Sequence, residues 1–369
     1  MNRAASPSPA RIERVRLHLL KVPLREPYRL AFGDLHAFDT LLVELTAADG
    51  RNGFGEATIL NGYTDERIDG AWQHATAFAQ QIVGTDASAL GMALVQTAAS
   101  APFATTAFGA ALEMLGAASV LQTARRVDVP LLALLQGDDR HQLADRFEAI
   151  LADGYRTVKI KVGLDKTGDL DRVARIQDVV AGRARIRIDA NQAFGAAEAV
   201  DFVRGLDPQG IELFEQPCAA GDWDAQRHVA DASRVPLMLD ESIYDIADIE
   251  RTAREGLAAF VKVKLMKFGS LARLEAALQR IRALGMQAVL GNGVACAPNC
   301  WMEACVAARH IDNAGEMNGF LKPRETLLVE PLVVERGALV LRPGWQPVLD
   351  RSALARCRLA VHEESVAHC

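Results

Sequence analysis

The feature that most limits the fold of this chain is a regular alternation of short strand-like runs and helical stretches, which begins near Val129. The strand-like runs are rich in Val, Ile and Leu, and the stretches between them carry apolar residues at helical spacing. From Lys161 onward the carboxyl ends of the runs recur about every 25 residues, the length of one strand plus one helix. The strand-like runs are 130–135, 157–162, 185–189, 211–215, 237–240, 260–265, 288–291 and 315–318.

Eight strand–helix units predict an α/β fold, a (β/α)8 barrel of the TIM type that is compact for its class. A doubly wound parallel sheet is the alternative. That fold favours a glycine-rich phosphate-binding loop after its first strand, and the segment from Leu135 to Asp138 is not such a loop. The expected helices of the barrel are 143–151, 170–180, 196–205, 246–255, 271–284 and 301–311.

A smaller α+β domain is expected ahead of the barrel, because strand-like runs precede helices there. Its strands are expected at 11–20, 41–44 and 53–57, and its helices at 71–83 and 106–121. A hairpin near the carboxyl end, at 332–334 and 338–341, is expected to return to this domain. The predicted organisation is a flexible tail at 1–10, the α+β domain at 11–127, the barrel at 128–322 and the return to the first domain at 323–369.

Composition limits the class of partner. The net charge is −6 and the isoelectric point about 5.8, whereas a nucleic-acid-binding domain carries a basic face. No apolar run approaches the roughly 18 residues of a membrane span, so we expect a cytoplasmic protein without a nucleic-acid or membrane partner. The six cysteines form no Cys-x-x-Cys pair, which favours a structural role for them.

Two pairs of lysines stand out because strand side chains alternate between faces. Lys159 and Lys161 share one face of their strand, while Val158 and Ile160 point the other way. Lys262 likewise lies two residues before Lys264. Inward-facing lysines are costly to bury unless carboxylates or a metal site compensate them.

The compensating carboxylates follow in order. Asp189, Glu215 and Asp240 each end a predicted strand, and the carboxyl ends of barrel strands form the catalytic face. Three oxygen ligands without a nearby His or Cys select Mg²⁺, with Mn²⁺ as the alternative ion. The sequence therefore predicts a metal site flanked by lysines on both sides.

This arrangement suits removal of a proton α to a carboxylate. The resulting enediolate carries two negative charges, which a divalent cation and an ammonium group stabilise. We assign Lys159 to the substrate carboxylate, and Lys161 and Lys264 to acid and base roles on opposite faces of the α-carbon. Neighbouring cations lower a lysine pKa to about 7–8, as a base requires.

These residues resemble the enolase superfamily, specifically its muconate-lactonising-enzyme subgroup within the mandelate racemase and muconate lactonising enzyme group. The resemblance covers nearly the whole chain. It implies that the small domain caps the barrel mouth, with loops 23–38 and 58–66 over the substrate, and that Glu241 supports the last metal ligand. The matching motifs are Lys159-Ile-Lys161, Asp189-Ala-Asn191, Glu215-Gln-Pro217, Asp240-Glu241-Ser242 and Lys264-Leu-Met-Lys267-Phe-Gly269.

The chain departs from the subgroup at several positions. No His follows the seventh strand, where Asn292 stands between two glycines, so lysine–lysine chemistry is favoured over lysine–histidine chemistry. Lys262 occupies a place that is often Asn or Ser. Glu316 and Asn318 fall where dipeptide epimerases have two aspartates that hold an ammonium group. The candidate substrate-binding residues are Lys159, Asn191, Lys262, Asn292, Glu316 and Asn318.

Three functions remain open. The first is an isomerase, meaning a racemase, epimerase or cycloisomerase, acting on an amino-acid-like or other small carboxylate. The second is a lyase or dehydratase that expels a β-leaving group, and the third is a non-catalytic metal-binding barrel. Barrels of this family often assemble, so a homo-oligomer is an open alternative. Lys267 is expected to be solvated, and Tyr28, Phe32 and Tyr63 are candidate lid contacts.

Overall fold

The computed structural model describes residues 11–30, 33–60, 64–98, 100–137, 139–165 and 167–366. Seven parallel strands form one curved sheet in the order β11-β10-β9-β8-β7-β6-β5. Their bounds are β5 Ala133–Leu134, β6 Thr157–Lys161, β7 Arg185–Asp189, β8 Ile211–Glu215, β9 Leu237–Leu239, β10 Phe260–Val263 and β11 Gln287–Leu290.

The eighth position of the barrel is held by backbone contacts rather than by a regular strand. The Leu132 amide donates to the Gly315 carbonyl at 3.0 Å, and the Glu316 amide donates to the Leu290 carbonyl at 2.9 Å. The segment around Gly315 therefore joins the first barrel strand to the last. The predicted TIM-type barrel is confirmed, although residues 315–318 do not form the strand that was expected there.

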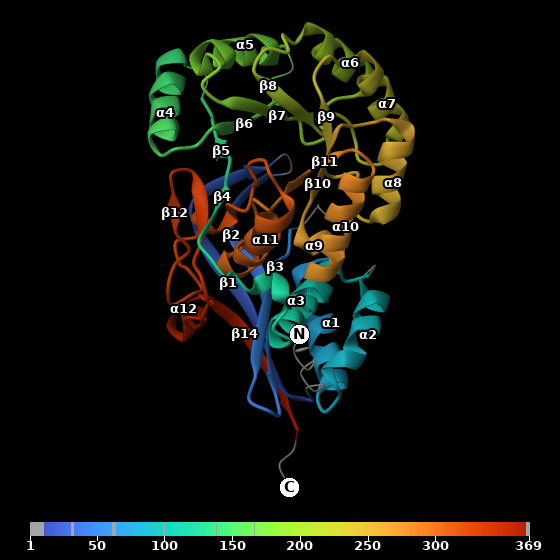
Figure 1. Ribbon diagram of the computed structural model, residues 1–369, viewed down its shortest axis with the longest axis vertical. Coiled ribbons are helices and arrows are strands. Elements are labelled where there is room, and N and C mark those ends of the chain that lie inside the picture. The colour runs from blue at the N-terminus through green and yellow to red at the C-terminus, as the bar shows by residue number, and fades with distance from the viewer. Residues whose placement is uncertain are drawn as a thin grey trace, which may run out of the picture.

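Helices surround this sheet because each presents an apolar face to it. Val158 and Ile160 of β6, for example, are fully buried in one cluster with Ile176 of α5. Figure 1 shows α4 to α8 as an arc around the strands in the upper half of the molecule. The helices are α4 Arg140–Ala152, α5 Asp169–Val180, α6 Ala196–Gly205, α7 Trp223–Ala232, α8 Ile246–Glu255, α9 Leu265–Phe268, α10 Leu271–Ala283 and α11 Ala297–His310.

A second, antiparallel sheet forms the capping domain in the lower half of Figure 1, in the order β14-β1-β2-β3. Helix α3 packs so closely on β3 that a Cβ atom on Gly55 would lie 2.1 Å from the Ala107 carbonyl oxygen. Glycine at this position therefore permits the contact between sheet and helix. The elements are β1 Ile12–Leu30, β2 Gly33–Ala47, β3 Asn52–Thr58, α1 Ile68–Ile82, α2 Leu90–Thr97, α3 Pro102–Leu115, α12 Arg351–Cys357 and β14 Arg358–Ser365.

The tail completes this sheet through β14, which pairs with β1 from Arg14 to Leu20. The predicted hairpin, β12 (Val334–Glu335) and β13 (Ala338–Leu341), instead pairs with β4 (Val127–Pro130) where the barrel begins. The exact domain boundaries stay predictions.

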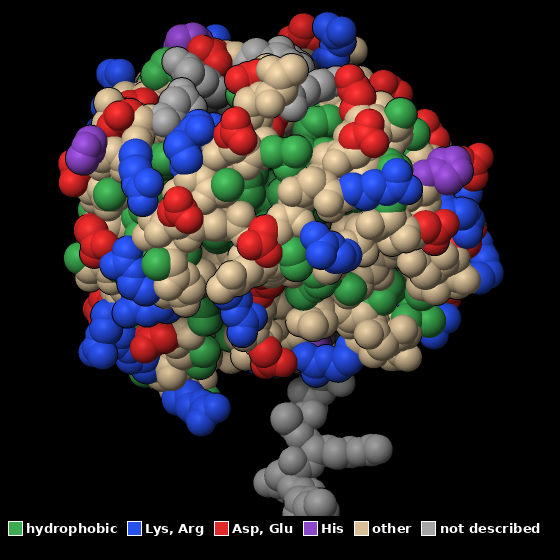
Figure 2. Space-filling view, turned by 90° about the horizontal axis from the view of Figure 1, so that it is seen from above, with side chains coloured by type: hydrophobic (Ala, Val, Ile, Leu, Met, Phe, Trp, Pro, Cys, Tyr) green, Lys and Arg blue, Asp and Glu red, His purple; other side chains and the backbone are tan. Residues whose placement is uncertain are grey.

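The predicted lid loop at 23–38 is mostly strand, because β1 and β2 continue as one long hairpin in which Tyr28 pairs with Leu35. The described cysteines are buried with free thiols. No helix among the described residues has the length and apolar character needed to cross a membrane. Figure 2 shows acidic and basic side chains interspersed over the face that it presents. The tail at 1–10, Phe32, Tyr63 and Cys369 lie outside the described residues.

Candidate active site

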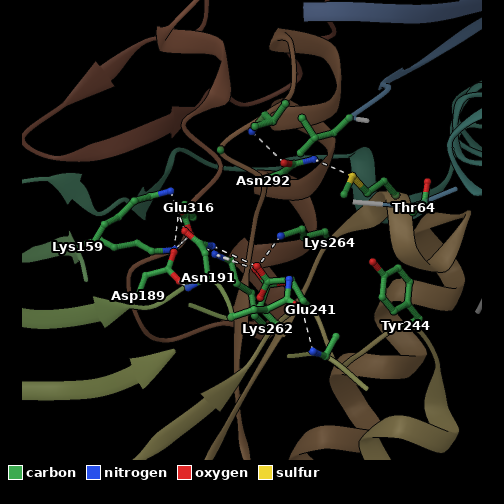
Figure 3. Close-up of a pocket in the computed structure, with 18 of the residues that line it drawn as sticks. Thr64, Lys159, Asp189, Asn191, Glu241, Tyr244, Lys262, Lys264, Asn292 and Glu316 are labelled. Carbon is green, nitrogen blue, oxygen red and sulfur yellow. Dashed lines mark hydrogen bonds and ion pairs between the residues drawn. The ribbon is translucent and has the colours of Figure 1, made fainter. Parts of the chain in front are cut away.

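A cavity of about 500 Å³ lies at the carboxyl ends of the barrel strands. The capping domain contributes Tyr28, Leu60, Thr64 and Asp65 to its wall, so parts of both predicted covering segments do reach it. Figure 3 shows the charged side chains of the strand ends directed toward one another in this cavity. The predicted site residues that line it are Lys159, Lys161, Asp189, Asn191, Asp240, Glu241, Lys262, Lys264, Asn292 and Glu316.

The order of the strands places the two predicted acid–base lysines on opposite sides of the carboxylates. Lys161 ends β6, and Lys264 directly follows β10. Strands β7, β8 and β9 lie between them in the sheet. Asp189, Glu215 and Asp240 are at the ends of these three strands and are each about 2% exposed or less.

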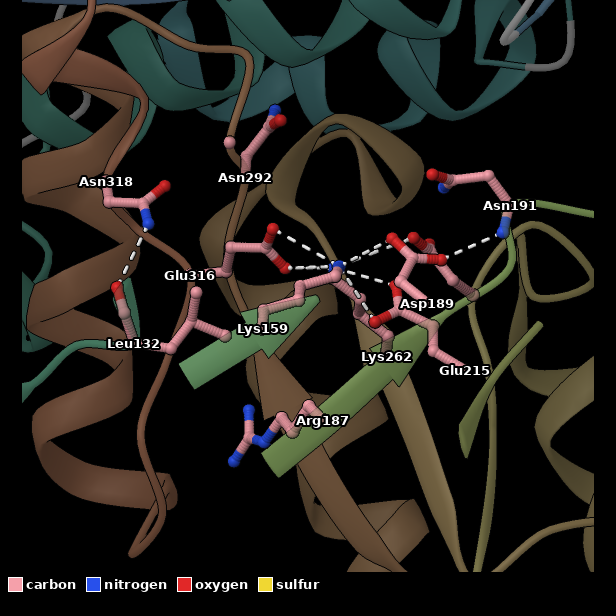
Figure 4. Close-up of polar contacts among 12 residues, drawn as sticks. Leu132, Lys159, Arg187, Asp189, Asn191, Glu215, Lys262, Asn292, Glu316 and Asn318 are labelled. Carbon is pink, nitrogen blue, oxygen red and sulfur yellow. Dashed lines mark hydrogen bonds and ion pairs between the residues drawn. The ribbon is translucent and has the colours of Figure 1, made fainter. Parts of the chain in front are cut away.

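Lys159 and Lys262 lie between the buried carboxylates. The Lys159 ammonium is 2.9 Å from Asp189 Oδ2 and 2.8 Å from Glu215 Oε2. The Lys262 ammonium is 3.0 Å from Glu215 Oε1 and also contacts Glu316. Burial alone would lower the pKa of Lys159, but the surrounding carboxylates outweigh burial and raise that pKa above its usual value. Burial would likewise lower the pKa of Lys262, but Glu215 and Glu316 outweigh burial and raise it. Figure 4 shows the two lysines between Glu316 on one side and Asp189 and Glu215 on the other.

Asp240 holds a second pair of lysines. Lys264 Nζ lies 2.8 Å from its Oδ2, and Lys267 Nζ lies 2.8 Å from its Oδ1. The expectation that Lys267 is solvated was wrong, since it is 8% exposed. Helix α9 begins immediately after Lys264, and its single turn brings Lys267 back to the strand end.

Lys161 has a different environment. Its ammonium donates to Asn191 Oδ1 at 2.9 Å, and Asn191 Nδ2 donates to Glu241 Oε1 at 3.2 Å. Burial, the largest effect on Lys161, lowers its pKa despite the nearby Asp189. Burial and the neighbouring Asp240 and Asp189 raise the pKa of Glu241 to about 7. Asn191 thus orients Lys161, which is easier to deprotonate than an ordinary lysine.

The three predicted metal ligands fit Mg²⁺ by their chemistry. Asp189 and Glu215 converge on the same ammonium group, and Lys262 joins Glu215 to Asp240 at 3.0 and 3.7 Å. Among the described residues, no three carboxylate, imidazole or thiol groups lie close enough to form a finished metal site. The lysines occupy the space between the carboxylates, and buried oxygen donors from adjacent strands are the ligands that Mg²⁺ prefers. Binding would require both ammonium groups to leave Asp189 and Glu215, whereas their contacts with Glu316 lie outside the predicted ligand set.

The remaining predicted substrate contacts differ in position. Asn292 lines the cavity, where its Oδ1 accepts the Val294 amide at 2.9 Å and shapes the loop after β11. Asn318 is not in the cavity wall, and its Nδ2 donates to the Leu132 carbonyl at 3.3 Å. The roles assigned to individual residues stay predictions.

Two tyrosines and a lysine at the site were missed or weakly indicated by the sequence. The Tyr28 ring lies near two ammonium groups, 5.8 Å from Lys161 and 4.5 Å from Lys322. Lys322 donates to the Gly293 carbonyl, and burial lowers its pKa to about 8. Tyr244 lines the cavity from the segment after β9. Lys322 and Tyr244 follow no motif, so only the folded chain brings them here.

The fold and the site define a capped TIM-barrel enzyme with carboxylates between two lysine-bearing strands. Residues 13–136 match the family described as mandelate racemase / muconate lactonizing enzyme, N-terminal domain, and residues 142–351 match the enolase C-terminal domain-like family. The chain therefore belongs to the mandelate racemase and muconate lactonizing enzyme family of the enolase superfamily.

Characterised relatives span most of the chain. It is 27% identical over 298 residues to the hydrophobic dipeptide epimerase of Enterococcus faecalis, covering 76% of this chain and 82% of the relative. It is 29% identical over 378 residues to muconate cycloisomerase 1-2 of Acinetobacter lwoffii, covering 95% and 96%. The chain is accordingly an isomerase-type enzyme of the superfamily.

The crystal structure of the dipeptide epimerase from Cytophaga hutchinsonii, complexed with Mg and the dipeptide D-Ala-L-Val, superposes with a TM-score of 0.86. The two chains are 22% identical, and the match covers 95% of this chain and 99% of that chain. At this identity the match shows the fold.

Proposed function

We propose that this enzyme removes the proton α to the carboxylate of an amino-acid-like or other small organic acid and returns a proton to the opposite face, as a Mg²⁺-dependent racemase or epimerase. One observation carries the proposal: Lys161 and Lys264 end strands that flank the three carboxylate-bearing strands. A substrate held over the carboxylates would therefore have one lysine on each face of its α-carbon.

Each lysine of the site has a distinct task in this proposal. Lys161 takes the α-proton from one face, oriented by the Asn191 amide. Lys264 delivers a proton to the other face and is held in place by Asp240. Lys159 turns its ammonium to the substrate carboxylate, where its charge favours the enediolate.

Asp189, Glu215 and Asp240 would hold the Mg²⁺. When bound, this ion supplies positive charge that stabilises the two developing oxyanions of the enediolate. The donor set supports this assignment, and the Cytophaga hutchinsonii relative has been crystallised with Mg.

The experiment that tests the proposal is α-hydrogen exchange in D₂O. The protein is incubated with Mg²⁺ and pooled acids, which include amino acids, dipeptides, N-acyl and N-methyl amino acids, cyclic imino acids and unsaturated diacids. Gain of one deuteron without loss of mass, together with inversion at the α-carbon, is the expected result. Loss of water would replace the proposal with a dehydratase. No exchange in any member, with Mg²⁺ bound, would mean that the substrate lies outside these classes of acid or that the barrel carries out no proton abstraction.

A further inference from the structure

Glu316 is the acidic group that the sequence placed where a substrate ammonium would bind. It lies in the segment that closes the barrel, lines the cavity and is 5% exposed. Its carboxylate already accepts two ammonium groups, because Lys159 Nζ is 3.1 Å from Oε2 and Lys262 Nζ contacts the same oxygen. Two positive charges therefore already offset the single negative charge of Glu316 before an incoming ammonium arrives.

Lys262 is the residue that gives Glu316 its second cation. It is 2% exposed and lies on β10, on the same face as Lys264 and between the carboxylates of Glu215 and Glu316. A serine or asparagine at this place would leave Glu316 with Lys159 as its cation. A substrate ammonium beside Glu316 would meet the Lys262 ammonium in a buried setting, where repulsion between like charges is weakly screened.

The other charged groups of the cavity also bear on whether a substrate ammonium could bind there. Asp189, Glu215 and Asp240 are each within 3.0 Å of a lysine ammonium. Two acidic groups complete the wall of the cavity, Glu241, which accepts the Asn191 amide, and Asp65, which is exposed. The five lysines that match these buried carboxylates are Lys159, Lys161, Lys262, Lys264 and Lys267. Asp189, Glu215, Asp240 and Glu316 thus each already contact a lysine ammonium, whereas Glu241 Oε2 has no hydrogen-bond partner among the described residues.

We propose that Lys262 is a specificity-determining residue that restricts the substrate to an acid whose α-nitrogen is acylated by a group without a free ammonium beside Glu316. This inference rests on the proposed function, since it assumes an acid with a nitrogen-bearing α-carbon. The apolar side chains of Leu60, Met266 and Val294 in the wall are suited to an uncharged acyl group.

Matched ligands test the proposal. N-propionyl-L-leucine and L-alanyl-L-leucine differ only by the ammonium group of the alanyl residue, and the same pairs can be made with glutamate, lysine and phenylalanine. Equilibrium binding to the full-length protein in saturating Mg²⁺ is measured by calorimetry. We expect the propionyl member of the best-bound pair to bind at least about tenfold more tightly. Equal or tighter binding of the alanyl member, or no binding in any pair, would overturn the proposal.

Two variants distinguish an effect of Lys262 on specificity from a general loss of structure. Lys262→Ser is expected to lower the propionyl-to-alanyl binding ratio at least about tenfold, and an unchanged ratio in the folded variant would overturn the proposal. Lys262→Met keeps most of the side-chain volume and removes only the charge, so the same fall in the propionyl-to-alanyl ratio is expected. An unchanged ratio in Lys262→Met would contradict repulsion by the Lys262 ammonium. This second variant decides the matter even if Lys262→Ser fails to fold.

Binding and turnover distinguish this inference from the proposed function. A propionyl preference without deuterium exchange in any ligand would contradict proton abstraction and leave the role of Lys262 standing. Exchange with both members of a pair at equal kcat/KM would support proton abstraction and contradict the role of Lys262.

Discussion

Lys161 and Lys264 have the same side chain but opposite surroundings. Lys161 faces the neutral Asn191 amide, and its pKa is lowered by burial. Lys264 instead forms an ion pair with Asp240 at 2.8 Å. Because Lys161 has a neutral partner and a lowered pKa, it is suited to accept a proton, so we expect turnover from one stereoisomer to begin at Lys161.

Single substitutions should show which lysine acts on which face of the α-carbon. Lys161→Ala is expected to lower deuterium exchange of one stereoisomer by about 10²–10⁴-fold and to leave exchange of the other stereoisomer detectable. Lys264→Ala should show the reverse preference. The measurement is deuterium incorporation into each stereoisomer separately, with a Mg²⁺ titration to confirm that the metal still binds. Wild-type exchange of both stereoisomers in both variants would contradict the two-lysine mechanism.

The assignment of the three strand-end carboxylates as Mg²⁺ ligands can be tested through the thermal stability of the protein. Because Mg²⁺ would bind only the folded chain, a concentration of 100 times its Kd should stabilise the protein by about 2.7 kcal/mol. We expect a higher Tm with Mg²⁺ or Mn²⁺, reversal by EDTA, and no response in Asp189→Asn. Differential scanning fluorimetry gives the result. A full response in Asp189→Asn would place the ion elsewhere.

At the scale of elements, local sequence patterns predicted the barrel well. Strands 185–189 and 211–215 and helices 196–205 and 246–255 have the predicted bounds, since each depends on residues within itself. The sequence also placed most candidate site residues at one cavity, because strand ends of a barrel converge.

Contacts between distant segments were beyond the sequence patterns. The turn of α9 that buries Lys267 and the continuation of β1 and β2 through the expected lid depend on neighbours far along the chain. The contact of Glu316 with Lys159 joins residues 157 positions apart. A pattern within one element carries no information about such pairs.

Helices α9 and α11 are joined by a buried carboxyl group whose effect should depend on pH. Glu303 Oε1 accepts the Leu265 amide at 2.8 Å, and its Oε2 has no hydrogen-bond partner among the described residues. Burial raises the pKa of Glu303 from 4.5 to about 8. The folded protein therefore retains a proton that the unfolded chain releases at lower pH, and this contribution to stability is lost as pH rises from about 4.5 through 8.

Glu303→Gln keeps a neutral amide at this position at every pH. The variant is expected to lose less stability than the wild type between pH 5 and 9, by an amount on the order of a few kcal/mol. Urea unfolding at several pH values measures the difference. If the two proteins show parallel pH profiles, Glu303 does not titrate in this range.

At the scale of the whole molecule, carboxylates of the capping domain accept hydrogen bonds from the first amides of barrel helices and so cap their N-termini. Glu56 of β3 accepts the Cys296 and Asn299 amides at the start of α11, both at 3.1 Å. Glu113 of α3 accepts the Leu271 amide at 2.6 Å at the start of α10. The free amides of a helix end are thus satisfied across the domain contact. Both helices follow strand ends that line the cavity, so the cap and the site are held by the same contacts.

The N-terminus of α10 is capped by a residue of the other domain, whereas that of α4 is capped by a neighbouring residue of its own chain segment. Glu113→Ala removes the acceptor for the amides of Leu271 and Ala272, and Asp139→Ala removes the acceptor at the start of α4, where Asp139 takes two amides at 3.0 Å. Each change should cost about 1 kcal/mol. In calorimetry we expect Asp139→Ala to shift one transition, whereas Glu113→Ala should also broaden it, because Glu113, unlike Asp139, links the two domains. A sharp single transition in both variants would mean that apolar packing alone couples the cap to the barrel.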